Sequence, residues 1–226
     1  MLGFLFRELC PACDGFSSAG FCSVCAGDLP RVAYPCRRCG LARPVARCPR
    51  QWAPWLVEAV VAPFVYAPPF DHHIQQLKYA GARAMGRALA LRLAAAVRDA
   101  GERIDLLVPV PLHPTRLRER GYNQAIEIAR PLSRELAVPA LLRGIERRRA
   151  SPSQTGHSAA LRRASVADAF RVTRDLEGTH VAIVDDVITT GATVNALAAA
   201  LHAAGAARCV AVAAARTPES HQPRNV

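Results

Sequence analysis

Two adjacent carboxylates, Asp185 and Asp186, stand between an apolar run and a loop of small, hydroxyl-bearing residues. From residue 181 to residue 194 the chain reads Val-Ala-Ile-Val-Asp-Asp-Val-Ile-Thr-Thr-Gly-Ala-Thr-Val. The apolar run is too short for a helix, so it predicts a buried strand that delivers both carboxylates to the carboxyl edge of a sheet. Carboxylates placed there can accept hydrogen bonds from sugar hydroxyls or hold a hydrated Mg²⁺ ion.

The loop at 189–193 has the composition of a phosphate-binding turn. Gly191 lets the backbone approach an anion without a Cβ in the way, and the threonine hydroxyls are further donors. An Ala/Leu stretch with helical character follows, and a helix N-terminus points its N–H groups and the positive end of its dipole at one spot. The alternative is that the acidic pair caps a helix and the threonines fill a turn. The unbroken order of strand, acidic pair, Thr-Thr-Gly-x-Thr and helix favours the phosphate site.

A second candidate for phosphate contact ends another apolar strand. Residues 108–113 read Val-Pro-Val-Pro-Leu-His and lead into Arg116, Arg118 and Arg120. A stiff loop presents its backbone donors with little loss of entropy on binding, and guanidinium groups bind phosphate oxygens in pairs. Taken alone, the arginines also fit a capped helix with a solvated basic face. Beside the phosphate-binding turn, the binding interpretation is favoured.

Cysteines gather near the N-terminus in C-x2-C pairs. Two such pairs complete a tetrahedral zinc site, and in a cytosolic chain this spacing indicates metal binding rather than disulfides. A segment this short has too little apolar surface to fold alone, so metal binding would contribute its folding free energy. The predicted zinc ligands are Cys10, Cys13, Cys22 and Cys25.

A second cysteine set is incomplete. Its three thiolates come from Cys36, Cys39 and Cys48. Gln51 stands where a fourth cysteine at the same spacing would fall, so this site is either lost or borrows a ligand, with His72 and His73 as weak candidates. The remaining cysteine, Cys209, lies in an apolar segment and is expected to be an inert core residue.

The elements that must position these residues begin at Trp52, where the cysteines stop. Strands are expected at 57–66, 104–110, 141–146, 170–172, 180–184 and around Cys209, and helices at 71–79, 82–99, 123–136 and after residue 193. Alternating strands and helices imply a doubly wound, mostly parallel α/β sheet covered on both faces, with ligands at the carboxyl ends of its strands. We expect a cysteine-rich zinc ribbon at 1–51 and an α/β domain at 52–226.

A formal net charge of +11 favours polyanionic partners, either nucleic acid or a heavily phosphorylated small molecule. Nearly all the basic residues are arginine, and Lys78 is the only lysine. Because arginine enrichment also follows genome composition, charge alone does not separate the two classes of partner. The apolar stretch at 194–215 is interrupted by polar residues, and residues 1–6 are too short for a signal peptide. We therefore expect no membrane span and a cytoplasmic protein.

The segment 181–194 resembles the diphosphoribosyl-binding signature of the type I phosphoribosyltransferases. The wider order, from the cysteine ribbon through Gln-Leu-Lys-Tyr at 76–79, Val-Pro-Val-Pro-Leu-His and Arg-Gly-Tyr-Asn-Gln at 120–124 to this signature, is similar to the ComF/GntX family. Some members of that family are late competence proteins required for DNA uptake. The resemblance covers essentially the whole chain and implies a type I phosphoribosyltransferase fold after the zinc ribbon.

Phosphoribosyl diphosphate (PRPP) is the substrate that this resemblance implies. The acidic pair would hold the ribose hydroxyls and act as the catalytic residues, and the loop after it would hold the 5-phosphate. The loop at 108–113 would hold the diphosphate together with Mg²⁺. The residues assigned to PRPP are Lys78, Pro109, Val110, Pro111, Arg116, Asp185, Asp186, Val187, Thr189, Thr190, Gly191, Ala192 and Thr193.

The implied reaction displaces diphosphate from C1 of PRPP, a pentosyl transfer whose acceptor the residues do not reveal. Two rival hypotheses stay open: a module that senses PRPP without turnover, and a protein that binds single-stranded DNA. Competence-machinery proteins are further partners that the resemblance suggests. Four aromatic side chains could stack bases, although packing is the more ordinary role for each: Trp52, Trp55, Tyr79 and Tyr122.

The chain departs from the family pattern at two places. Gln51 replaces the eighth zinc-ribbon cysteine. In the segment 151–170, serines stand where the family usually has threonine before Gln154 and asparagine near position 165. We expect that segment to form a loop that closes over the substrate.

Overall fold

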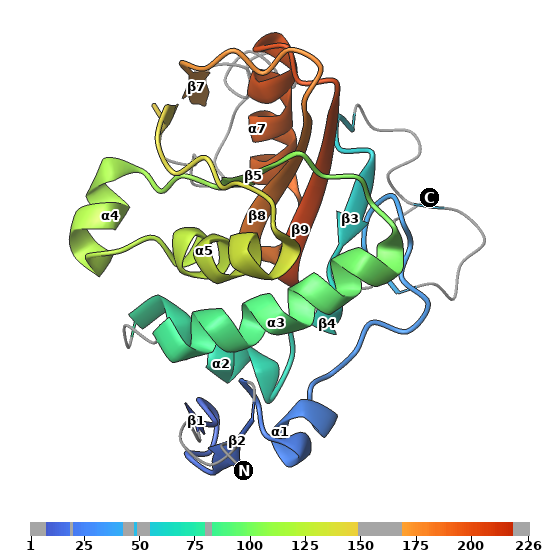
Figure 1. Cartoon of the computed structure of the whole chain (residues 1–226), viewed down its shortest axis with the longest axis vertical. Coiled ribbons are helices and arrows are strands. Elements are labelled where there is room, and N and C mark those ends of the chain that lie inside the picture. Colours follow the sequence, from blue (N-terminus) through green and yellow to red (C-terminus); the bar gives the residue numbers. More distant parts are fainter. Residues whose placement is uncertain are drawn as a thin grey trace, which may run out of the picture.

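A parallel sheet forms the centre of the computed structural model, which describes residues 8–18, 20–42, 48, 55–79, 83–148 and 169–218. Its strands lie in the order β3-β9-β8-β5 (Figure 1). They span Ala59–Val61 (β3), Arg208–Arg216 (β9), His180–Ile188 (β8) and Leu106–Pro109 (β5), and β4 (Phe64–Val65) pairs with the end of β9. All these pairings are parallel, which confirms the predicted sheet.

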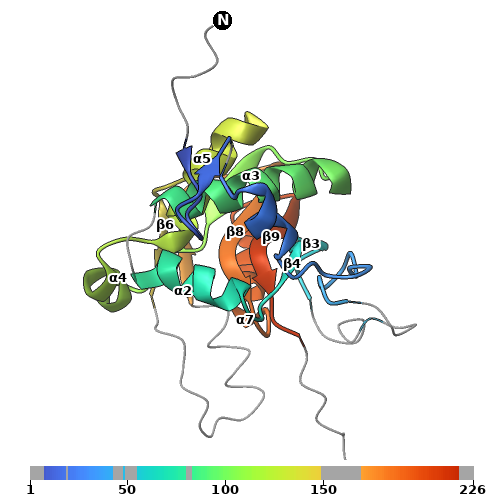
Figure 2. The same cartoon turned by 90° about the horizontal axis from the view of Figure 1, so that it is seen from below.

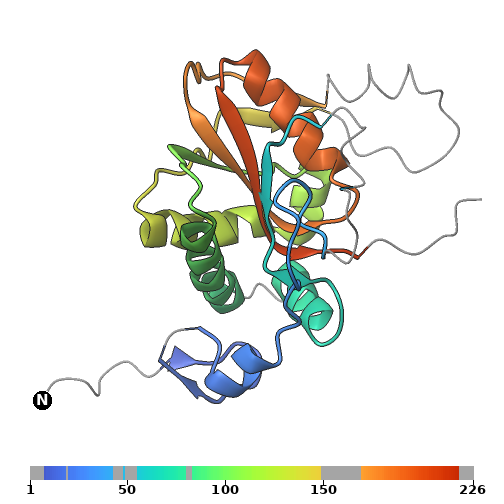
Figure 3. The ribbon, with the colours of Figure 1, turned by 90° about the vertical axis from the view of Figure 1, so that its right-hand side faces the viewer.

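Helices cover both faces of the sheet, because alternate side chains of its strands point to opposite sides. Ala182 and Val184 of β8 face a core formed with α2 (Phe70–Tyr79), α3 (Arg83–Ala100) and α5 (Gln124–Leu136). Val181 and Ile183 face a second core formed with α7 (Ala192–Ala203). Figure 3 shows α7, in orange-red, on the other side of the sheet from α3, in green. This arrangement is the doubly wound sheet that the sequence predicts.

The cysteine-rich part meets the α/β part at two places. Its first half, with β1 (Glu8–Leu9), β2 (Phe16–Ser17) and α1 (Ser23–Gly27), lies beside α2 and α3 (Figure 2). Its second half runs along the edge of the sheet, where the Val65 N–H donates to the Pro30 carbonyl at 2.7 Å and the Val32 N–H to the Pro63 carbonyl at 2.9 Å. The domain boundary at 51/52 lies outside the described residues and stays a prediction.

Several element bounds differ from the sequence prediction. The strand expected at 57–66 is divided into β3 and β4, with Pro63, which has no N–H to donate, in the gap between them. The strand expected at 141–146 is displaced to β6 (Ile145–Arg147), which pairs antiparallel with β7 (Phe170–Val172). Around Ala140 there is only an isolated bridge to Leu107.

The arginine-rich segment forms a short helix, α4 (Pro114–Arg120), which projects from the sheet at the left of Figure 1. His113 caps it by accepting a hydrogen bond from the Thr115 N–H at 3.4 Å. The local conformation is therefore the capped helix that the sequence left as an alternative. Several residues of the sequence predictions lie outside the described part of the chain: 1–6, Gln51, Trp52, Gly81, the side chain of Tyr79, and 151–168.

Candidate functional site

The acidic pair lies within the second half of β8 rather than after its end. Pairing with β9 continues past Val184, since Asp185 lies opposite Ala213 and Val187 opposite Ala215. The strand predicted at 180–184 was therefore too short. Asp186 faces α2, since its carboxylate contacts Lys78 of that helix.

Lys78 from the last turn of α2 reaches the acidic pair. Its ammonium group lies 3.0 Å from Oδ2 of Asp186, whose side chain is only 7% exposed. The hydroxyl of Tyr122 donates to the Leu77 carbonyl, which fixes this end of α2 against the start of α5. Two residues that the sequence assigned to PRPP from distant segments, Lys78 and Asp186, are thus brought into contact.

Asp185 has a strongly perturbed environment. Burial and the neighbouring Asp186 carboxylate raise the pKa of Asp185 well above its ordinary value. The Asp186 N–H, which donates to Oδ1 of Asp185 at 2.9 Å, and the charge of Lys78 act in the opposite direction. A pair of close carboxylates with unequal environments is suited to binding a cation or exchanging a proton.

Arg147, at the end of β6, is a site residue that the sequence prediction missed. Burial lowers the pKa of Arg147, while the charge of Asp185 raises it and the charge of Arg116 lowers it. The three groups are therefore close enough to interact electrostatically. The guanidinium also lies 5.5 Å from the centre of the Phe170 ring. In the sequence Arg147 sits in an arginine run with no distinguishing spacing, so no local signal marked it.

The phosphate-binding turn links β8 to α7. Gly191 caps α7 with a φ of 80° and provides no side-chain acceptor for the N–H groups of the first turn. Thr189, Thr190 and Ala192 are exposed, and the Thr190 hydroxyl accepts from the Ala192 N–H at 3.3 Å. These features fit an anion, as the sequence predicts for this turn.

Trp55 packs directly against this turn. A Cβ added to Gly191 would lie 2.3 Å from the Trp55 ring, so glycine is required both by the backbone conformation and by the space. The next residue is tied to α7, since the Leu56 N–H donates to Oδ1 of Asn195 at 2.6 Å. The packing role that the sequence analysis preferred for Trp55 agrees with this position.

The second predicted loop is fixed by backbone and side-chain bonds. The Val110 N–H donates to the Val184 carbonyl at 2.9 Å, and the Val110 carbonyl accepts from Nδ2 of Asn123 at 2.9 Å. The buried Asn123 also caps α5 by accepting from the Ala125 N–H at 2.9 Å. Pro109 ends β5 and Pro111 follows Val110, so the loop at 108–113 begins at the same edge of the sheet as the acidic pair.

A pocket of about 150 Å³ opens between α2 and α4, lined by Lys78, Arg116, Glu119 and Arg120. Three of its four lining residues are cationic, and Lys78 connects it with Asp186. A larger hollow of about 650 Å³ lies at the opposite end of α7 from Gly191, around Ala203 and Gly205. That hollow contains none of the predicted site residues, so the smaller basic pocket is the one that belongs to the candidate site.

The cysteines form the two groups that their spacing predicts. In each group the sulfur atoms all lie within 4.8 Å of one another; the groups are Cys10, Cys13, Cys22 and Cys25, and Cys36, Cys39 and Cys48. Although burial raises the pKa of Cys10, backbone donors of Cys22, Ala12 and Cys13 lower it to about 7, while burial and the neighbouring thiols raise the pKa of Cys25. Four such sulfurs fit a structural zinc ion, and three fit an incomplete site.

The remaining candidate ligands lie elsewhere. His72 and His73 belong to neither cysteine group, and the His73 ring packs 5.8 Å from that of Phe21. Cys209 is fully buried in β9, and burial raises its pKa to about 12. It is the inert core thiol that the sequence predicts.

Comparisons with known proteins agree with this geometry. A family described as phosphoribosyl transferase domain matches residues 123–225. The DNA utilization protein YhgH of Escherichia coli (strain K12) is 38% identical over 198 residues, covering 83% of this chain and 86% of that protein. Competence protein F of Haemophilus influenzae is 33% identical over 221 residues, covering 91% of this chain and 95% of that protein.

Among solved structures, glutamine PRPP amidotransferase from B. subtilis is 21% identical with a TM-score of 0.43, over 62% of this chain and 30% of that chain. This likeness is too weak to bear on function. The domain match at 123–225, by contrast, contains the acidic pair and the phosphate-binding turn. In the described part of the chain, no helix has both the length and the apolar character needed to cross a membrane.

Proposed function

The chain belongs to the ComF family, and from this premise we propose that it is a phosphoribosyltransferase-like protein that binds PRPP and acts in the uptake or use of DNA. The DNA role comes from relatives named competence protein F and DNA utilization protein YhgH. The binding role is carried by one observation: the acidic pair, the N-terminus of α7 and the basic pocket around Lys78 share one edge of the sheet.

In the proposed complex, Asp185 and Asp186 accept hydrogen bonds from the two ribose hydroxyls. The turn at 189–193, with Val187 before it, surrounds the 5-phosphate and donates its backbone N–H groups and threonine hydroxyls. Lys78, Arg116 and the loop at 109–111 face the diphosphate. The 3.0 Å ion pair between Lys78 and Asp186 supports this assignment, because it holds the cation next to the carboxylate on which the ribose would sit.

The acidic pair also fits Mg²⁺, which proteins bind through one or two carboxylates together with substrate phosphates. Bound with PRPP, the ion would neutralise charge on the diphosphate. The chain's own cations would act on the same group: Lys78, Arg116 and Arg120 would stabilise the charge that grows as diphosphate leaves C1. Asp185 and Asp186 would hold the ribose in place during this step.

Zinc is the metal that we assign to the four-cysteine group, in a ribbon at 1–51 that precedes a phosphoribosyltransferase domain at 52–226. Four thiolates in one cluster are the donor set of a closed, structural zinc site. The protein would act in the cytoplasm, where PRPP and competence-machinery proteins are its expected partners. The acceptor of the phosphoribosyl group is not assigned, so PRPP sensing without turnover is the alternative within the same site.

Calorimetric titration with PRPP and Mg²⁺ tests the proposal. Wild-type protein should bind PRPP. The Asp185→Asn/Asp186→Asn variant should lose binding, because its amides are uncharged ligands for Mg²⁺ and weaker acceptors of hydrogen bonds from the ribose hydroxyls. Asp28→Asn/Asp99→Asn is the matched control, since it removes two carboxylates from exposed positions. Folded wild-type protein that does not bind PRPP would refute the proposed function.

Single-stranded DNA binding is a second candidate, favoured by the net charge of +11 and by the exposed arginines of α4. Phosphate contacts release counterions, so log affinity should fall linearly with log salt concentration. The charge reversal Arg118→Glu should weaken binding and make that slope shallower by about 1 to 2, the value expected for the loss of one or two phosphate contacts. Binding that does not change with salt would remove this candidate.

A further inference from the structure

The second cysteine group lies in a knuckle that closes the edge of the sheet. Cys36 and Cys39 are 2% and 1% exposed, and the Arg37 carbonyl between them accepts from the Val60 N–H of β3 at 2.7 Å. Gly40 completes the turn with a φ of 71°, and a Cβ there would lie 2.7 Å from Val60. The knuckle backbone therefore packs closely against β3.

An ion cluster around the buried Glu102 carboxylate contacts the knuckle from a second direction. Oε1 of Glu102 lies 2.8 Å from the guanidinium of Arg37, and Oε2 lies 2.8 Å from that of Arg208 at the start of β9. The Glu102 side chain is only 1% exposed, whereas that of Arg37 is 70% exposed and that of Arg208 27%. Arg37 is consequently tied both to the sheet edge and to the strand beside β8.

Arg216 joins the knuckle to the phosphate-binding turn. It ends β9, is 2% exposed, and donates through Nε to the Cys39 carbonyl at 2.9 Å. Through Nη1 it donates to the Ile188 carbonyl at 2.8 Å and to the Thr189 carbonyl. One buried guanidinium thus holds a metal-ligand residue and the first residues of the turn together.

Trp55 makes a second, independent link. Its indole N–H donates to the Arg38 carbonyl, inside the knuckle, at 3.0 Å. Its ring covers Gly191 on the turn, at the distance that excludes any Cβ there. Both links end on backbone carbonyls between or at the paired cysteines, so the knuckle's conformation directly sets where Arg216 and Trp55 lie.

We propose that a thiolate-binding metal ion such as Zn²⁺, held by Cys36, Cys39 and Cys48, organises the phosphate-binding turn for PRPP, and that Arg216 and Trp55 are the positioning residues. The metal fixes the knuckle, the knuckle's carbonyls fix the two side chains, and these hold the turn. Binding of PRPP and metal occupancy of this group are then coupled, and the coupling is reciprocal. The inference rests on the proposed function for its PRPP arm only.

The first cysteine group provides the contrast. It packs against α2 and α3, where a Cβ on Gly20 would lie 2.9 Å from the Ala88 backbone. Loss of its metal is therefore expected to leave the surroundings of Trp55 unchanged. The two groups can be separated experimentally because each contains its own C-x2-C pair.

The test uses the full-length Trp52→Phe protein, in which Trp55 is the only tryptophan. Metal content, acrylamide quenching of Trp55 and calorimetric PRPP affinity are measured for this parent, for Cys36→Ser/Cys39→Ser and for Cys10→Ser/Cys13→Ser. Cys36→Ser/Cys39→Ser should lose the metal of the second group only and show stronger quenching of Trp55 in the absence of PRPP. It should also bind PRPP about tenfold more weakly than the parent. The first-group variant should lose metal without a change in quenching.

Two further variants address the links themselves. Arg216→Lys, which cannot reach all the carbonyls at once, and Trp55→Phe, which deletes the indole donor, should keep the parent's metal content and bind PRPP more weakly. If either keeps full affinity, its link is not used. These variants also decide the case if the double cysteine variant unfolds.

The outcomes separate the two proposals. Unchanged quenching and unchanged PRPP affinity in Cys36→Ser/Cys39→Ser would overturn the coupling. A parent protein that fails to bind PRPP would refute the proposed function, while stronger quenching on metal loss would still support the link between knuckle and turn. Quenching that rises equally in both cysteine variants would show a general loosening and would also overturn the coupling.

Discussion

Asp185 is a carboxyl group that the fold holds in unfavourable surroundings. Its pKa is raised by burial and by Asp186, so the native state binds its proton more tightly than the unfolded state does. Between the ordinary carboxyl pKa and the raised value, the free energy of unfolding therefore falls as pH rises. A group kept at such a cost is expected at a functional site rather than in a merely structural one.

Asp185→Asn should therefore stabilise the protein at pH 7 while abolishing PRPP binding with Mg²⁺. Each kcal/mol relieved raises the melting temperature of a chain of this size by about 2–4 °C. The advantage should vanish as the pH falls to about 3, where wild-type Asp185 is largely protonated in both states. Calorimetric melting at the two pH values measures this, with the exposed Asp99→Asn as control. A variant less stable than wild type at pH 7 would contradict the argument.

Gly191→Ala should destabilise the protein through both backbone strain and the Trp55 ring, which lies 2.3 Å from the added Cβ. Strain at a positive φ amounts to about 1–3 kcal/mol. Gly101→Ala is the matched control, since Gly101 has a φ of 63° and open space around it. Urea unfolding of both variants separates the two effects: a larger loss at Gly191 is the contribution of the ring. Equal losses of unfolding free energy in the two variants would show that the Trp55 ring moves aside at little energetic cost.

At the residue scale, site residues that lie in one contiguous motif can be predicted from the sequence. Site residues that come together only in the folded chain cannot. Asp185, Asp186 and Gly191 stand in an ordered run, so their types and spacing suffice. Arg147 and Arg216 acquire their roles only when β6 and β9 bring them beside β8 and its turn. An arginine that ends a strand of buried apolar residues was the one available signal for Arg216.

At the scale of elements, apolar runs and helical periodicity predict the strands and helices that build the sheet. The expected 123–136 helix is α5, with Asn123 as its N-cap, and the 170–172 strand is β7. Where the strand bounds predicted from the sequence are wrong, the true bounds depend on the neighbouring strand. β8 extends to Ile188 because it pairs with β9 as far as that residue. The residues of 180–188 alone do not reveal how far this pairing extends.

Asn123 joins two elements of the site, so Asn123→Ala tests whether its cap serves binding as well as stability. The variant loses the bond to the Val110 carbonyl and the cap of α5, which should cost about 1–2 kcal/mol in urea unfolding. PRPP affinity should fall as the loop at 108–113 loosens.

Ser133→Ala is its counterpart at the other end of α5, where the Ser133 hydroxyl donates to the Val138 carbonyl at 2.6 Å. It should cost about 1 kcal/mol and leave PRPP affinity unchanged. Equal affinity in both variants would mean that the Asn123 bond to the loop is structural only.

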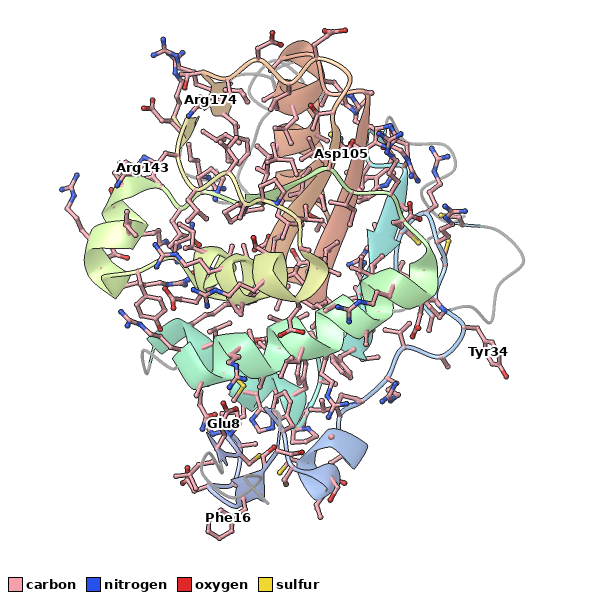
Figure 4. The ribbon with its side chains drawn as sticks, in the orientation of Figure 1. Glu8, Phe16, Tyr34, Asp105, Arg143 and Arg174 are labelled. Atoms are coloured by element: carbon pink, nitrogen blue, oxygen red, sulfur yellow. The ribbon has the colours of Figure 1, made fainter. Side chains whose placement is uncertain are left out.

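At the scale of the whole molecule, the two cysteine groups have different dependence on the α/β body. The second is enclosed by the sheet edge, whereas the first is attached to α2 and α3 through a few buried residues, among them Cys10, Phe21 and Leu29. Figure 4 shows Phe16 at the outer tip of the ribbon, where it is 68% exposed. We expect so little apolar burial to be insufficient to order the first half by itself, and we propose that a bound metal ion supplies the remaining stability.

Loss of that metal should therefore release the first half of the ribbon and leave the sheet folded. In Cys10→Ser/Cys13→Ser, limited proteolysis should cut within 8–29 about tenfold faster than in wild type, because local opening exposes this backbone to the protease. The fragment that remains should keep the far-ultraviolet dichroism of the parallel sheet. Cys209→Ser should keep the wild-type metal content, since its thiol is enclosed in β9. Equal protection of the ribbon with and without metal would show that its packing on α2 and α3 suffices.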